Sequence, residues 1–382
     1  MPVDAAQLRS ALAGRLPAVD PAWRAAVEAV PRELFFDGAF YRARQGRRGT
    51  EWEPVVQALI GDDEWLALVY EDSTWVTQID GADADWNAGV VTTGDATSSS
   101  TLPSLVVRTL EAAAIQDGDR VLEIGTGTGY STALLSHRLG EKHVTSVEVD
   151  RALAARAAAH LAAAGYVPRL IVDDGLDWRD EETEFDRLVA TCSVRSIPTA
   201  WLWQVRAGGT IAVTLSGWMM ASGLLRLTVG EDGGAQGGFT GEPVSYMLAR
   251  PHGRPPRPTF FRHEGEIRAG RVNPVLLDDR AAHLVAQLAA PSAELLGSGD
   301  EVTLLDVATG SLAWTEAAAS GDGWSVHQHG PLRLWDQVET ALAGWQKAGS
   351  PPLSAFGVTV TPDMEQSVWM GDPDGPSWQL PA

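Results

Sequence analysis

The sequence predicts an α/β fold: a doubly wound, mostly parallel sheet, preceded by a helical segment and followed by a smaller α+β domain. Three observations lead to this prediction. Short, nearly continuous β-branched runs alternate with helix-like runs between residues 103 and 216. Three alternate glycines, in "GTGTG" at 125–129, join one such strand to a helix. A proline-rich stretch, "PHGRPPRP" at 251–258, separates this region from a C-terminal part of different texture.

The N-terminal segment, residues 1–90, is predicted to be mainly helical. Apolar residues recur at three- and four-residue spacing in "DAAQLRSALAG" (4–14) and "PAWRAAVEAVPRELFF" (21–36). Asp20 followed by Pro21 is a suitable cap with proline at the first helical position. The stretch 64–80 alternates in part and is β-like, and 81–103 is a polar loop of small residues.

The central domain, residues 91–250, carries the alternation of strands and helices. Its β-branched runs predict strands at 120–124, 143–149, 169–174, 185–193 and 208–216. The runs between them predict helices at 104–114, 130–139, 151–164 and 197–205.

The accessory domain, residues 259–382, follows the linker at 251–258. It contains "EVTLLDVATGSLAWTE" and a hairpin-like stretch at 356–370. A helix with one apolar stripe is expected between these two, carrying Trp335, Val338, Leu342 and Trp345.

Charge and composition narrow the classes of partner. The 382 residues include 29 basic and 50 acidic ones, for a net charge of −21, which argues against binding nucleic acid. No apolar run is long enough for a membrane span, and the N-terminus lacks a secretory signal pattern. We therefore expect no membrane partner and a cytoplasmic location, which the lone Cys192 also suits.

No metal is expected. His327 and His329 form an H-x-H pair, but no third ligand type stands nearby in the sequence. The oligomeric state is left open by the sequence.

The glycine turn suggests a nucleotide-type ligand at a helix N-terminus. A dinucleotide fingerprint has the spacing G-x-G-x-x-G, whereas Gly125, Gly127 and Gly129 are spaced G-x-G-x-G and Tyr130 follows. Glu123, inside the preceding strand, would repel a pyrophosphate and favour a cationic sulfonium. A nicotinamide oxidoreductase is therefore disfavoured.

Further acids end the next two strands. Glu148 lies nineteen residues beyond Gly129, where a carboxylate can accept both ribose hydroxyls. Asp174 can accept from an adenine amine, and Gly175 leaves room for the ring. The alternative is a purely structural role, as an ordinary βαβ glycine turn with helix-capping acids.

The pattern resembles that of class I S-adenosylmethionine (AdoMet)-dependent methyltransferases, so the resemblance implies AdoMet as cofactor. It assigns cofactor contacts to the turn and to the strand ends, at Glu123, Gly125, Thr126, Gly127, Gly129, Tyr130, Ser131, Glu148, Val149, Asp174, Gly175 and Thr191.

Segments outside this signature resemble the protein-L-isoaspartate O-methyltransferase family, in the family's order, over roughly residues 20–250. "AVPRELFF" (29–36) is similar to its "VPRexF" segment, and "YEDS" (70–73) to its "AYxD" stretch. "SSSTLPSLV" (98–106) stands where the family has "TISxPxM", with Thr101 in place of the serine. "VDDGLDW" and "FDRLVATCSVRSIP" follow its "GDGxxGW" and "YDRIxVxAAxxxIP" blocks.

The resemblance implies methylation of an aspartyl or isoaspartyl carboxylate in a peptide or protein substrate. A polar insertion before the serines departs from the family pattern. The C-terminal extension resembles that of homologues found with ribosomally made, modified peptides in actinobacteria. There the enzyme methylates an aspartate of a cyclised precursor, and the ester collapses to a succinimide (aspartimide). Repair of isoaspartyl damage is the alternative, and a non-catalytic AdoMet-binding module is the alternative of another class.

The expected chemistry needs no general base, because a carboxylate with a pKa near 3.9 is already ionised at about pH 7. Hydroxyls can hold the acceptor, which makes Thr101, Ser100, Ser99 and Ser98 the candidate catalytic residues; the alternative is a flexible polar loop. Trp65, Trp75 and Trp86 flank this region and suit either peptide contact or core packing.

Overall fold

The computed structural model describes residues 4–16, 20–46, 50–84, 89–262, 265–297, 299, 301–318 and 323–381. The chain forms two compact units. The first comprises Met1–Thr191 and Pro198–Ala212, and the second comprises Cys192–Ile197 and Val213–Ala382. Within the described ranges, no helix is both long and apolar enough to cross a membrane.

A parallel sheet forms the centre of the first unit. Strand β6 (Val121–Ile124) pairs in parallel with β7 (Val144–Glu148) and with β9 (Phe185–Val194), and β7 pairs with β8 (Arg169–Val172). Strand β10 (Val205–Leu215) follows β9 in the sheet order. Every residue of β6 and β7 is buried, as expected for parallel strands covered on both faces. The predicted α/β fold is therefore confirmed.

The four helices of this part of the chain lie close to their predicted ranges. They are α5 (Pro103–Ala112), α6 (Tyr130–Leu139), α7 (Arg151–Ala163) and α8 (Thr199–Gln204). Asp150 caps α7, because its side chain accepts from the N–H groups of Ala152 and Leu153. A short 3-10 turn, η2 (Glu141–His143), precedes β7.

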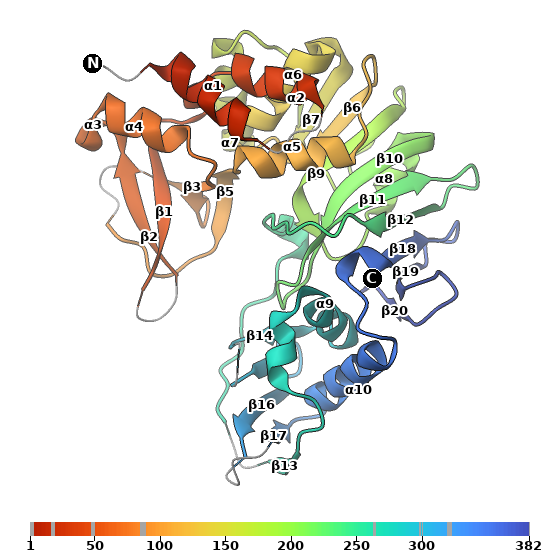
Figure 1. The fold of residues 1–382 in the computed structure, drawn as a ribbon. Coiled ribbons are helices and arrows are strands. Elements are labelled where there is room, and N and C mark those ends of the chain that lie inside the picture. Colours follow the sequence, from red (N-terminus) through yellow and green to blue (C-terminus); the bar gives the residue numbers. More distant parts are fainter. Residues whose placement is uncertain are drawn as a thin grey trace. The chain divides into compact units, whose positions relative to one another are not determined.

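The N-terminal helices are confirmed, but the segment is not mainly helical. Helices α1 (Ala5–Arg15) and α2 (Pro21–Ala29) pack together, α2 lies beside α6, and Asp20 caps α2 (Figure 1). The second helix ends before Pro31, because proline disfavours the helical conformation in the residue that precedes it. A 3-10 turn, η1 (Arg32–Phe35), replaces the rest of the predicted helix.

A five-stranded antiparallel sheet, not foreseen from the sequence, completes this segment. It has the order β2-β1-β3-β4, and β5 also pairs with β3. Its strands are β1 (Ala39–Gln45), β2 (Thr50–Val56), β3 (Trp75–Ile79), β4 (Ala82–Asp83) and β5 (Ala96–Ser100). Helices α3 (Gln57–Ile60) and α4 (Asp62–Val69) stand between β2 and β3.

Two predictions are corrected here. The β-like stretch 64–80 is helix in its first part and strand only from Trp75. The polar loop predicted at 81–103 contains β5. Its serines have weak β propensity, and the segment is a strand because it pairs with β3, which supplies the backbone hydrogen bonds.

Aromatic side chains form the core below this sheet. The ring of Phe40 stacks on Trp65 at 4.8 Å and on Trp75 at 4.6 Å between centroids. Trp65 and Trp75 are thus core residues, buried to 2% and 5% exposure. Trp86 lies outside the described residues.

The second unit contains an antiparallel ribbon and a separate sheet. The ribbon has the order β20-β19-β18-β12-β11, with β11 (Gly223–Val229), β12 (Ala235–Phe239), β18 (Phe356–Val360), β19 (Gln366–Met370) and β20 (Ser377–Gln379). The predicted hairpin at 356–370 is the pair β18–β19. Turns η3 (Arg250–His252) and η5 (Leu353–Ala355) flank the inserted sheet and helices.

The separate sheet has the order β13-β17-β16-β15-β14. Its strands are β13 (Glu266–Ala269), β17 (Trp324–His329), β16 (Leu312–Ala317), β15 (Thr303–Asp306) and β14 (Ala293–Leu295). Turn η4 (Pro274–Asp278) leads into helix α9 (Arg280–Ala289), which packs on α10 (Leu334–Lys347). The predicted apolar stripe of α10 is buried at Trp335, Val338, Leu342 and Trp345.

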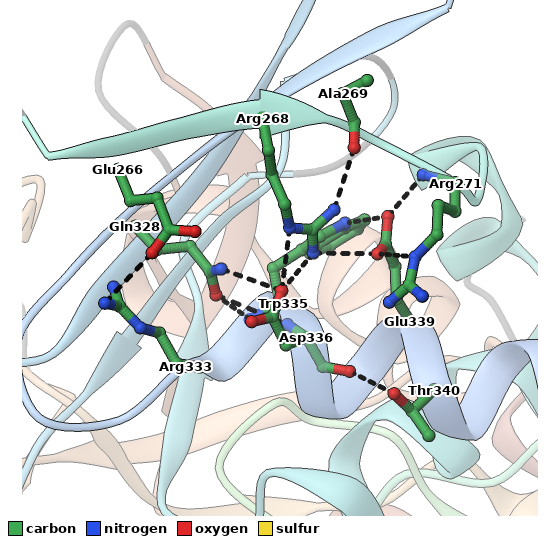
Figure 2. Close-up of polar contacts among 10 residues, drawn as sticks. All are labelled: Glu266, Arg268, Ala269, Arg271, Gln328, Arg333, Trp335, Asp336, Glu339 and Thr340. Atoms are coloured by element: carbon green, nitrogen blue, oxygen red, sulfur yellow. Dashed lines mark hydrogen bonds and ion pairs between the residues drawn. The ribbon is translucent and has the colours of Figure 1, made fainter.

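A polar network fastens α10 to strands β13 and β17 (Figure 2). Gln328 on β17 accepts from the Trp335 N–H at 2.8 Å, which satisfies a free donor at the start of the helix. Arg268 on β13 pairs with Asp336 and lies 2.8 Å from Glu339. Glu339, only 1% exposed, also accepts from the Arg271 N–H at 2.6 Å.

Candidate functional site

The turn after β6 requires glycine at three positions. Gly125, Gly127 and Gly129 have φ values of +95°, +56° and +95°, in the left-handed region that other residues rarely adopt. The N–H of Gly125 donates to the carbonyl of Val147 at 2.8 Å, which holds the turn against the end of β7. The alternate glycines are therefore explained by backbone conformation.

Glu148 ends β7 and binds the same turn. One carboxylate oxygen accepts from the Gly127 N–H at 2.9 Å and the other from the Asp150 N–H at 3.0 Å. Val149, the next residue, is 43% exposed at this edge of the sheet. The carboxylate expected to accept ribose hydroxyls thus lies beside the turn expected to cradle the ligand.

The ends of β8 and β9 complete this edge. Asp174 is half-buried and accepts from the Leu176 N–H at 3.0 Å. A Cβ on Gly175 would lie 2.7 Å from a methyl of Ile124, so this position has no room for a side chain. Thr191 donates to the carbonyl oxygens of Ile124 and Gly125, and so positions the first residues of the turn.

Contrary to the expectation from the sequence, Glu123 does not face the ligand edge. It is fully buried, and its oxygens accept from the hydroxyls of Ser131, Thr132 and Ser146. Burial raises the pKa of this carboxyl, while the three hydroxyl bonds act in the opposite direction. With none of its surface exposed, Glu123 positions the start of α6 instead of facing a cationic ligand.

The polar side chains around Glu123 belong to the same buried network. The hydroxyls of Thr126 and Ser146 lie 2.6 Å apart, and Thr126 is 3% exposed. Ser131 is 7% exposed and directed at Glu123. The side chains of Thr126 and Ser131, both expected at the cofactor, therefore serve to fix the turn.

Tyr130 is also a core residue. It is 4% exposed, and its ring packs edge-on against Phe35 at 5.6 Å. Burial raises the pKa of its hydroxyl to about 12. Its ring does not line the open edge of the sheet, so a contact with a ligand there could involve only its backbone.

The hydroxyl cluster divides by burial: side chains alternate between the two faces of β5, and Thr101 follows the last residue of that strand. Ser98 and Ser100 point into the core, at 4% and 1% exposure, and Ser98 accepts from the Thr77 hydroxyl at 2.9 Å. Ser99 and Thr101 are half-exposed. Of the four candidates, Ser98 and Ser100 are thus structural, and only Ser99 and Thr101 face outward.

The backbone of β5 lies beside the glycine turn. The carbonyl oxygen of Ser99 is 3.9 Å from the position that a Cβ on Gly127 would occupy, and no other atom comes within 4 Å of that position. Strand β5 and the glycine turn therefore adjoin, although 28 residues separate Ser99 from Gly127.

The segment after β5 is held in place by residues 72–74. The Leu102 N–H donates to the Thr74 hydroxyl at 3.1 Å, and the Ser104 N–H at the start of α5 donates to Asp72 at 2.8 Å. Asp72 of the "YEDS" stretch and Thr74, just after it, thus fix the backbone on either side of Pro103.

His160 was not among the predicted site residues. Its Nδ1 lies 3.0 Å from the Thr128 carbonyl oxygen and its Nε2 lies 2.9 Å from Asp37, so it links the glycine turn to the segment before β1. Nothing in the alanine-rich run of α7 distinguishes this histidine, because the contact joins residues far apart in the sequence.

Known proteins resemble this chain in the region that contains β5, the glycine turn and the parallel strands. The family model of protein-L-isoaspartate(D-aspartate) O-methyltransferase matches residues 77–222. A protein-L-isoaspartate O-methyltransferase 2 of Rhodopseudomonas palustris is 30% identical over 190 residues, which cover 49% of this chain and 81% of that protein. The chain belongs to the protein-L-isoaspartate O-methyltransferase family.

Other relatives match over shorter stretches. The protein-L-isoaspartate O-methyltransferase of Ignicoccus hospitalis is 35% identical over 113 residues, covering 29% of this chain and 54% of that protein. That of Thermotoga maritima is 33% identical over 153 residues, covering 40% and 44%. The chain spans about half the length of the first curated relatives that it matches.

A solved protein-L-isoaspartate O-methyltransferase shares the fold over nearly the whole chain. The TM-score is 0.54 at 18% identity, and the alignment covers 97% of this chain and all of that one. The α/β unit accordingly has the class I methyltransferase fold. The C-terminal extension thus has a counterpart in that solved structure, so it does not by itself separate this chain from other family members.

Proposed function

We propose that this protein is an AdoMet-dependent carboxyl O-methyltransferase that methylates an aspartyl or isoaspartyl side chain of a peptide or protein. One observation carries the proposal: the backbone of β5 at Ser99 adjoins Gly127 of the glycine turn, so the partly exposed Ser99 and Thr101 belong to a segment that lies next to this turn. A methyl acceptor on one and a methyl donor on the other would meet there.

The residues present fit the cofactor. The left-handed glycines allow close approach to the backbone, and Glu148 provides an acceptor beside them for ribose hydroxyls. A carboxylate offers about four lone-pair sites, so Glu148 can accept further bonds besides those to the backbone. Asp174 would accept from the adenine amine, and Val149 would contact the ring. When bound, AdoMet supplies an electrophilic methyl group.

The acceptor needs orientation more than activation. Its carboxylate, with a reference pKa of about 3.9, is ionised near neutral pH and attacks without a general base. The Thr101 and Ser99 hydroxyls would donate to the non-attacking oxygen or to the neighbouring peptide group. Catalysis then rests on alignment of the acceptor oxygen with the methyl group and on the exclusion of water.

The substrate class is the finer part of the proposal. Family membership supports isoaspartyl residues of damaged proteins as substrate. The resemblance of the C-terminal extension to that of peptide-modifying homologues is the ground for proposing an aspartate of a ribosomally made precursor, with succinimide formation after methylation. We take the second as the narrower proposal and the first as its alternative.

A mass-spectrometric assay tests both levels. Full-length protein and AdoMet are mixed with a short isoaspartyl peptide, its aspartyl twin, a cyclised aspartyl form and an asparaginyl control. Gain of one methyl group on an acidic peptide, but not on the control, supports carboxyl methylation. Methylation of the isoaspartyl peptide alone selects repair, and methylation of an aspartyl form selects the narrower proposal. AdoMet binding without any transfer would support the non-catalytic alternative.

A further inference from the structure

We propose that Arg32 is a positioning residue for the acceptor: its guanidinium holds the backbone of Ser100 and Thr101 and places a positive charge behind the strand end that receives the acceptor carboxylate. This inference rests on the proposed carboxyl methylation. Arg32 belongs to "AVPRELFF" (29–36), the stretch that is similar to the family's "VPRexF" segment.

The guanidinium of Arg32 binds two segments at once. One terminal nitrogen donates to the carbonyls of Val69 at 2.7 Å and Glu71 at 2.8 Å. The other lies 3.3 Å from the Ser100 carbonyl and 3.2 Å from that of Thr101. The side chain is fully buried, so these bonds are made away from solvent.

Residues 72–74 also bind the backbone around Thr101. Arg32 binds its carbonyl groups, whereas Thr74 and Asp72 accept its N–H groups at Leu102 and Ser104. Both kinds of backbone group around Thr101 are therefore fixed by side chains. A hydroxyl so placed keeps one orientation towards a substrate, which lowers the cost of ordering it on binding.

Among the described residues, Arg32 forms no ion pair with direct contact, although the Asp72 carboxylate acts on its charge from farther away. Its hydrogen-bond acceptors among the described residues are carbonyl oxygens and the Ser100 hydroxyl, all of them uncharged. The rings of Phe36 and Tyr130 lie 5.7 Å from its Cζ and shield it from water. In such a low-dielectric setting, a charge acts on neighbouring groups more strongly than it would in water.

A local positive charge matters for this acceptor. The chain carries a net charge of −21, so the overall field repels an anionic substrate. The Arg32 guanidinium donates to the carbonyl oxygen of Thr101, the residue whose hydroxyl would hold the carboxylate. It should therefore favour the ionised acceptor over a neutral analogue of the same shape.

The experiment separates this role from a purely structural one. Full-length wild type, Arg32→Lys and Arg32→Met are titrated, in the presence of S-adenosylhomocysteine, with an isoaspartyl or aspartyl peptide, whichever the wild type methylates, and with its neutral side-chain amide. We expect Arg32→Met to weaken binding of the anionic peptide by about tenfold to a hundredfold. The neutral amide should change far less, and AdoMet affinity should stay the same. Arg32→Lys should retain most of the preference for the anion while lowering kcat.

Arg138→Met is the matched control, because Arg138 is another buried arginine of the first unit, with its Cζ 4.3 Å over the Trp23 ring. It should leave the ratio of anion to amide affinity unchanged. Circular dichroism checks folding, and Arg32→Gln serves if Arg32→Met does not fold. An equal loss of affinity for both peptides would overturn the inference and leave Arg32 structural. Failure of the proposed function is a different result, since the wild type would then methylate neither peptide.

Discussion

At the scale of single residues, the site depends on which side of a strand or turn each side chain takes. Ser99 and Thr101 are half-exposed, whereas Ser98 and Ser100 are buried, with Ser98 bonded to Thr77 and Ser100 to Arg32. Glu148 borders the glycine turn at the sheet edge, whereas Glu123 lies beneath it among hydroxyls. Residues of one type in one motif therefore have different roles.

Thr101→Val should lower methyl transfer while leaving AdoMet affinity nearly unchanged. Valine keeps the shape of threonine but removes the donor, and a bond to a charged acceptor is worth about 1.5–3 kcal/mol, or roughly tenfold to a hundredfold in kcat/KM. Single-turnover rates and calorimetry measure the two quantities. Ser98→Ala is the contrast: it should reduce thermal stability with little effect on the rate. Equal rate losses in both variants would show that the partly exposed Thr101 and the buried Ser98 do not differ in role.

Glu148→Ala should weaken AdoMet binding by roughly tenfold to a hundredfold, because a charge-assisted acceptor beside Gly127 is lost. Isothermal calorimetry with full-length protein measures this, and the exposed Glu231→Ala serves as control. Unchanged affinity in Glu148→Ala, or tighter binding of NAD than of AdoMet, would contradict the cofactor assignment.

At the scale of elements, polar networks decide where helices and strands are fixed. In the second unit, α10 is attached to β13 by Arg268 and Arg271, which both bind Glu339 (Figure 2). Burial alone would raise the pKa of Glu339, but the bonds from Arg271 and Arg268 hold it below its ordinary value. Asp336 shows the same balance, with Arg268 as its main partner.

Glu339→Gln should lower the free energy of unfolding by roughly 1.5–3 kcal/mol near pH 7, because the charge that binds two arginines is lost. A carboxyl with a depressed folded pKa stabilises the protein above its unfolded pKa of about 4.3, and this contribution is lost as pH falls through the folded value. The difference in Tm between wild type and variant should therefore shrink below about pH 4. The exposed Glu365→Gln is the control. A Tm difference independent of pH would contradict the role of this charge.

At the scale of the whole molecule, the C-terminal residues complete a sheet of the second unit. Strand β12 pairs with β18 from Ala235↔Val360 to Gly238↔Gly357, so residues on both sides of the stretch 251–258 share one ribbon. Strand β20, at the end of this ribbon, pairs only with β19 and has three residues. The ribbon makes its inner strands dependent on residues more than a hundred positions away.

Deletion of residues 251–382 should yield an aggregating protein, because β12 becomes an unpaired edge strand. Deletion of residues 371–382 removes only the outermost short strand and should leave a folded protein with a slightly lower Tm. Size-exclusion chromatography and thermal unfolding distinguish the two. A soluble shorter chain with the Tm of the full-length protein would show that β12 does not depend on β18.

The sequence alone determined the features that depend on local pattern. Buried β-branched runs predicted the parallel strands within a few residues, Asp20-Pro21 predicted the start of α2, and the spacing of Trp335, Val338, Leu342 and Trp345 predicted the buried stripe of α10. The alternate glycines predicted a tight turn after β6, and Glu148 was expected beside it, because this spacing follows from strand and turn geometry.

Only the tertiary structure decided what depends on pairing between distant segments. The serines of β5 have weak β propensity, and they form a strand because β3 supplies the hydrogen bonds. That pairing then decided which hydroxyls are buried. Likewise, Arg32 meets Thr101 across 69 residues and Glu123 meets Ser146 across 23, contacts that no local periodicity encodes. Periodicity reports which face of an element is apolar, but long-range hydrogen bonding decides which polar groups remain for function.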